Sequence, residues 1–141
     1  MERSTVRWCV VENLMITFST PGTLTDPDFD NWMKEFRAKP FTRYLNTSLG
    51  YVNLTSVQRK LAAEAMKEKA VKTSVVTDEM LLRGMVTAVA WLGADVKAFS
   101  WADLAVAIRH LDVVPATEVR AIDAVHRLKG SSTPAGAGAH R

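Results

Sequence analysis

Two hydrophobic periods alternate along this chain of 141 residues, and the alternation limits the folds that it can adopt. Regions in which every second residue is apolar are typical of strands, and regions with apolar residues three and four positions apart are typical of helices. We expect strands in the regions 5–20, 41–48, 71–77 and 96–99. We expect helices at 25–39, 55–69, 79–92, 100–111 and 117–129. Strands that alternate with helices favour a parallel sheet with right-handed crossovers.

The first strand region contains two alternating runs, Val6-Trp8-Val10 and Leu14-Ile16-Phe18. Glu12-Asn13 is a plausible two-residue turn between them because Asn tolerates positive φ, and one unbroken strand is the alternative. The predicted fold class is therefore α/β. It has a single open, mostly parallel β-sheet of about five strands, with one antiparallel edge, packed helices and an extra C-terminal helix.

One domain is expected over residues 1–129. Residues 130–141 are rich in Gly, Ala and Ser, and we expect them to form a disordered tail. The 18 basic and 15 acidic residues interleave, so no basic face for nucleic acid is predicted. The single cysteine, Cys9, favours a cytoplasmic protein. The longest apolar run, 85–94, is too short to predict a membrane span.

Patterns that would indicate catalysis are absent from the sequence. It contains neither the P-loop nor the Rossmann glycine spacing, and no Gly-x-Ser-x-Gly elbow. His110, His126 and His140 stand apart from one another and from Cys9, so no zinc cluster is expected. We therefore predict no enzyme activity, no catalytic residue, no metal site and no cofactor.

The region 79–92 is apolar around most of its helical circumference, and Arg83 is the one charge between Met80 and Leu92. A helix of this kind is expected to be buried on more than one side. Another helix of the same chain, such as 117–129, could cover it. Alternatively, part of its surface meets a second molecule, including a second copy in a homo-oligomer. Asp78 is the expected N-cap and Gly93 the expected C-terminal cap.

Two hydroxyls, Thr55 and Ser56, stand where a strand and loop give way to a helix. Thr55-Ser-Val-Gln58 fits a capping box, in which Thr and Gln satisfy the free amides of the helix start. The same helix start would also stabilise a phosphate group, so Thr55 and Ser56 are candidate phosphorylation sites. The candidate partner-binding residues are Asn53, Thr55, Ser56, Gln58 and Arg59.

Three segments together resemble a known family. Leu45-Asn46-Thr47 ends a predicted strand, and Leu54-Thr55-Ser56-Val57 begins the next helix. Later, 79–93 closes in Leu-Gly, and 96–100 ends in Phe-Ser before an Ala- and Leu-rich helix. From about Val6 to Asp112, the chain resembles a STAS domain, the sulfate-transporter and anti-sigma-factor-antagonist family. Asn46, Leu54 and Val57 stand where that family has Asp, Asp and Gly, and Thr55 stands at its phosphorylatable serine.

The resemblance implies a STAS-like, non-catalytic protein-interaction module in bacterial signalling. Its partner would be a regulatory protein or a kinase-like anti-sigma factor that docks on residues 49–59, with helix 79–92 close by. The alternative is a binding module for a small apolar ligand or lipid. In that case a pocket could be lined by the aromatic residues Trp32, Phe36, Trp91, Phe99 and Trp101.

Overall fold

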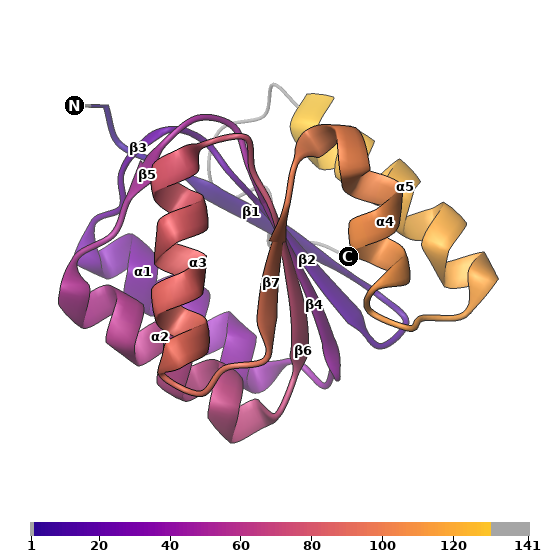
Figure 1. Cartoon of the computed structure of the whole chain (residues 1–141), viewed down its shortest axis with the longest axis horizontal. Coiled ribbons are helices and arrows are strands. Elements are labelled where there is room, and N and C mark those ends of the chain that lie inside the picture. Colours follow the sequence, from indigo (N-terminus) through magenta and orange to yellow (C-terminus); the bar gives the residue numbers. More distant parts are fainter. Residues whose placement is uncertain (1, 131–141) are drawn as a thin grey trace.

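The computed structural model describes residues 2–130 and contains a five-stranded sheet with helices on both faces (Figure 1). The strands are β1 (Val6–Val11), β2 (Leu14–Ser19), β4 (Arg43–Ser48), β6 (Lys72–Val76) and β7 (Val96–Phe99). They follow the order β1-β2-β4-β6-β7, with β1 antiparallel to β2 and every other pair parallel. The prediction of a mostly parallel α/β sheet with one antiparallel edge is confirmed.

The first two strands form the predicted hairpin, with Val11 paired to Leu14 across the turn. The positive backbone angle lies at Glu12, with φ of 54°, and not at Asn13 as the turn propensities predicted. The amide nitrogen of the Asn13 side chain instead donates to Thr42 Oγ1 at 2.8 Å. Asn13 is thus used to hold the turn against the segment that enters β4.

A second, two-stranded sheet was not predicted. Strand β3 (Gly22–Thr23) pairs in parallel with β5 (Val52–Asn53), within the region expected to be a loop. Strands of two residues are too short for a hydrophobic period to reveal them. Gly22 is required here because its φ is 131° and an added Cβ would lie 2.1 Å from the carbonyl oxygen of Glu2.

The helices form two layers. Helices α1 (Asp26–Ala38), α2 (Ser56–Lys69) and α3 (Met80–Trp91) cover one face of the sheet (Figure 1). The 3₁₀ turn η1 (Trp101–Asp103), α4 (Leu104–Arg109) and α5 (Pro115–Gly130) lie on the other face. The extra C-terminal helix is confirmed and includes Gly130. The rest of the predicted tail, residues 131–141, lies outside the described residues.

Helix α5 does not cover α3, contrary to one expectation from the sequence. Ala121, Ala124 and Val125 are fully buried in the hydrophobic cluster that α5 shares with α4. The Arg7 guanidinium on β1 donates to the Leu128 carbonyl at 2.9 Å and ties the end of α5 to the sheet edge. The chain crosses to the second face after β7, so α3 and α5 lie on opposite sides of the sheet.

Two local predictions are wrong in detail. Asp78 does not cap α3; its Oδ1 accepts a hydrogen bond from the backbone N–H of Trp101 at 3.0 Å. In α2, helical spacing predicts a buried stripe of Val57, Leu61, Ala62, Ala65 and Met66. Val57 and Leu61 are exposed instead, and the buried side consists of Gln58, Ala62, Ala63, Ala65 and Met66.

A buried tyrosine connects the sheet to α1. Tyr44 is fully buried, and its Oη lies 2.9 Å from Thr17 Oγ1. The same oxygen accepts from Trp32 Nε1 at 3.1 Å and from Asn46 Nδ2 at 3.0 Å. Burial raises the pKa of Tyr44 to about 12, although its three hydrogen bonds act in the opposite direction.

This pKa predicts a loss of stability at high pH. Between pH 10 and 12 the unfolded chain releases the Tyr44 proton while the folded chain keeps it, so rising pH favours unfolding. We expect this residue to remove about 2–3 kcal/mol from the free energy of unfolding across that range. Urea denaturation at several pH values measures it, with Tyr44→Phe as the control that lacks the ionisable group. Equal alkaline losses in both proteins would contradict the assignment.

Candidate binding site between the sheet and helices α2 and α3

The structure gathers the five predicted binding residues at one place, the entry into α2. Asn53 ends β5, Thr55 is the N-cap of α2, and Ser56 is its first residue. Thr55 and Ser56 are exposed, while Asn53 and Arg59 are half-buried. Gln58 is only 1% exposed, so its side chain acts inside the domain.

The predicted capping box is confirmed. Thr55 Oγ1 accepts from the Gln58 backbone N–H at 3.0 Å, and Gln58 Oε1 accepts from the Thr55 N–H at 3.0 Å. Gln58 Nε2 also donates to the Leu24 carbonyl at 3.0 Å and to Asp26 Oδ1 at 2.9 Å. This amide therefore joins the start of α2 to the start of α1.

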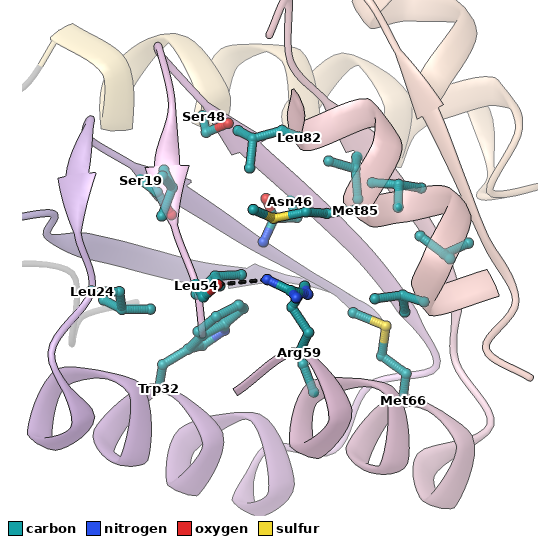
Figure 2. Close-up of a pocket in the computed structure, with 16 residues that line it drawn as sticks. Ser19, Leu24, Trp32, Asn46, Ser48, Leu54, Arg59, Met66, Leu82 and Met85 are labelled. Carbon is teal, nitrogen blue, oxygen red and sulfur yellow. Dashed lines mark hydrogen bonds between the residues drawn. The ribbon is translucent and has the colours of Figure 1, made fainter. Parts of the chain in front are cut away.

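Behind this helix start lies a cavity of about 90 Å³ between the sheet and the helices (Figure 2). It is several times larger than the roughly 10–15 Å³ that one water requires. Most of its wall is aliphatic or aromatic, and its polar side chains are Ser19, Asn46, Ser48 and Arg59. The apolar lining residues are Leu24, Trp32, Val52, Leu54, Ala62, Met66, Val75, Leu82, Met85, Val86, Val89 and Val96.

Arg59 brings a positive charge to this apolar cavity. Its Nη1 donates to the Leu54 carbonyl at 2.7 Å, the bond drawn in Figure 2. No carboxylate within residues 2–130 forms an ion pair with Arg59. Arg59 is also the one charged side chain among the described residues that line the cavity. The site therefore favours an anionic group.

Strand β4 supplies two polar side chains to the sheet wall of the cavity. Asn46 and Ser48 are two residues apart and so face the same side as Tyr44. Ser48 is 3% exposed, and its Oγ has no hydrogen-bond partner among the described residues. A buried hydroxyl without a partner costs about 1–3 kcal/mol, so Ser48 is suited to bond with a bound molecule.

The pocket of five aromatic residues expected from the sequence does not form. Trp32 lines the cavity, but Phe36 packs in the core against Phe41 and Tyr44, with ring centroids 5.1 and 5.0 Å away. Trp91 is exposed to solvent, and Phe99 and Trp101 belong to the opposite hydrophobic cluster. Their separation depends on which face of the sheet each helix and strand presents, which spacing along the chain does not show.

Helix α3 presents two different apolar faces. Its inner stripe of Leu82, Met85, Val86 and Val89 closes the cavity. On the outer stripe, Met80, Leu81, Trp91 and Leu92 are 77%, 67%, 85% and 48% exposed. The sequence prediction that another helix of the same chain buries this side is therefore wrong for the described residues. The all-round apolar pattern comes from a buried stripe and an exposed stripe on one helix.

Most of the cavity could not be assigned from the sequence, although Arg59 was among the predicted site residues. The signal that was available is helical spacing, because Arg59, Ala62 and Met66 lie on one side of α2. No sequence pattern showed that this side and the inner stripe of α3 face a common space. Their distance from the sheet is set by tertiary packing.

The described residues contain no cluster of three or more His, Cys, Asp or Glu that could hold a metal ion. None of the helices within residues 2–130 has the length and hydropathy needed to cross a bilayer. No family model matches the chain, and no curated protein matches it. The likeness to STAS domains thus remains an expectation from the sequence pattern.

The capping box predicts a graded loss of stability on truncation. Thr55→Ala should lower the free energy of unfolding by about 1 kcal/mol because the backbone N–H of Gln58 loses its acceptor, Thr55 Oγ1. Gln58→Ala should cost about 2–4 kcal/mol because its buried side chain loses three hydrogen bonds. Urea denaturation followed by circular dichroism measures both. Ser56→Ala is the matched control, and a midpoint for Thr55→Ala equal to this control would refute the role of the cap.

Proposed function

We propose that this chain is a non-catalytic protein-interaction module of the cytoplasm. A protein partner covers the outer stripe of α3 and the adjoining helix start at Thr55-Ser56. The observation that carries this proposal is the exposure of Trp91, Leu81 and Met80 on one uncharged helix face. Large apolar patches that remain in contact with water mark interaction surfaces.

The two parts of the proposed surface belong to one layer of helices. Helices α2 and α3 contact each other on the same face of the sheet (Figure 1). The helix start at Thr55 and Ser56 therefore lies in the same layer as the outer stripe of α3. A partner that contacts Met80 and Leu81 can reach this helix start as well.

Docking on α3 is favoured by its chemistry. Full burial of a large apolar side chain contributes about 1.5–3 kcal/mol, and the outer stripe offers several such side chains. Arg83, the one charged residue of α3, points elsewhere and donates to the Thr77 carbonyl at 3.3 Å. No charge on the stripe has to lose its hydration when a partner binds. Trp and Met are also enriched at the centres of interfaces.

The partner class follows from the STAS resemblance: a regulatory protein or a kinase-like anti-sigma factor. Phosphorylation of Thr55 or Ser56 would add about −1.5 to −2 charges beside an apolar surface. The helix start would stabilise the phosphate within the domain, while the partner would have to desolvate it. Modification is therefore expected to release the partner.

Removing apolar side chains from the outer stripe of α3 should weaken docking strongly. Leu81→Ser and Trp91→Ser should each lower recovery of the native partner by about tenfold or more in affinity capture with crosslinking. Val119→Ser on α5, where Val119 is 70% exposed, is the matched control on the opposite face. Light scattering of the purified protein shows whether a second copy is the occupant. If both α3 variants form the same crosslinks and show the same mass in light scattering as the unmodified protein, the outer stripe of α3 is not the interface.

A negative charge at the start of α2 should weaken partner binding without lowering the stability of the fold. Ser56→Asp places a carboxylate in the first turn of α2, where the helix dipole favours it, so the urea midpoint should not fall. Binding of the captured partner should weaken relative to Ser56→Ala. Equal affinity of the partner for both variants would show that this helix start lies outside the interface.

A second proposal is that the domain also binds a small, mainly apolar ligand. The specific observation is the cavity of about 90 Å³ beneath α3. Its walls use both β-strand and helix residues, as ligand pockets commonly do. This function uses the inner stripe of α3 and not the outer stripe, and its test accompanies the ligand chemistry below.

A further inference from the structure

We infer that the cavity under α3 binds a small amphipathic carboxylate, with its apolar body against the helices and its head on Arg59. This inference rests on the proposed ligand-binding function and adds the chemical class of the ligand. It is carried by the position of the Arg59 guanidinium, which forms no ion pair within residues 2–130 and lies in a largely aliphatic cavity.

Arg59 is arranged to receive an anion. Figure 2 shows its side chain extending from α2 into the cavity, where Nη1 meets the Leu54 carbonyl. A guanidinium carries five N–H donors, and this hydrogen bond uses only one of them. The planar donor fork matches a carboxylate in a bidentate geometry. Since Leu54 fixes one side of the group, the guanidinium is held in place for a ligand.

The balance of charge selects a monoanion. Arg59 is the one charged side chain among the described lining residues, so a single carboxylate produces a neutral pair. A phosphate dianion would leave excess negative charge in an apolar environment, where desolvation is costly. Asn46, which also lines the cavity, contributes a neutral amide and does not repel the anion.

The remaining wall suits an alkyl body. Trp32, Met66 and Met85 contribute large apolar side chains, and the flexible methionines can adapt to different chain lengths. Val86 and Val89 close the side formed by α3. A few polar groups among apolar walls are typical of sites that orient one end of a small molecule.

Ser48 adds a second, independent indication that the cavity holds a polar atom of a ligand. It is nine-tenths buried or more, lines the cavity, and its Oγ has no hydrogen-bond partner among the described residues. Its hydroxyl can donate to a carboxylate oxygen or accept from a ligand hydroxyl. Strand β4 therefore offers one polar contact and α2 offers the counter-charge.

The test compares octanoate with 1-octanol, two probes that differ mainly in the charge of the head. Isothermal titration calorimetry measures affinity, and the indole N–H resonance of Trp32, assigned with Trp32→Phe, reports whether the probe enters the cavity. We expect octanoate to bind about tenfold to hundredfold more tightly, the range for a hydrogen bond to a charged group.

Substitutions at the cavity identify the group that binds the head. Arg59→Gln should reduce the affinity for octanoate to the level of 1-octanol and leave the affinity for 1-octanol unchanged. Asn46→Asp should also weaken octanoate binding, because the new carboxylate supplies Arg59 with a counter-ion. Arg109→Gln, an exposed arginine on α4 across the sheet, is the matched control and should change neither affinity. Urea midpoints confirm that each variant is folded.

The outcomes separate the ligand class from the ligand-binding function itself. If octanoate and 1-octanol bind equally and both shift Trp32, the cavity binds apolar molecules but the carboxylate assignment is wrong. If Arg59→Gln retains full octanoate affinity, the role of Arg59 is refuted. If neither probe shifts Trp32 at millimolar concentration, both the carboxylate assignment and the proposed ligand-binding function fail.

Discussion

The hydroxyl of Tyr44 is the contact on which the helical layer and the cavity both depend. It is fully buried and meets Thr17 on β2, Trp32 on α1 and Asn46 on β4. A buried polar group of this kind depends on hydrogen bonds within the domain, because water does not reach it. Because Trp32 and Asn46 also line the cavity, the network that joins α1 to the sheet also positions part of the cavity wall.

Gln58 has a comparable role at the start of α2. Its amide satisfies the N-terminus of α2 and holds the Leu24 carbonyl and the Asp26 carboxylate of the neighbouring element. The next residue, Arg59, is thereby placed on a helix whose first turn is rigidly anchored. Rigid support of this kind is what a group requires if it is to meet a ligand without a large loss of entropy.

Helix α3 connects the two proposed binding functions. Its inner stripe forms one wall of the cavity, and its outer stripe is exposed for a partner. Any displacement of α3 by a molecule in the cavity would also move Leu81 and Trp91. If the ligand and the partner each prefer one of two positions of this helix, each changes the affinity of the other by the same factor.

The sequence by itself determined the features that depend on neighbouring residues. The hairpin of β1 and β2, the alternation of strands and helices, the parallel sheet and the Thr55–Gln58 capping box were all predicted, because local periods and caps act over a few positions. Tertiary structure decided the rest. Asp78 bonds with Trp101 instead of capping α3, α5 packs on the face opposite α3, and Arg59, Asn46 and Ser48 line one cavity. These relations join residues far apart in the chain, and their geometry arises only when sheet twist, helix placement and side-chain volume are satisfied together.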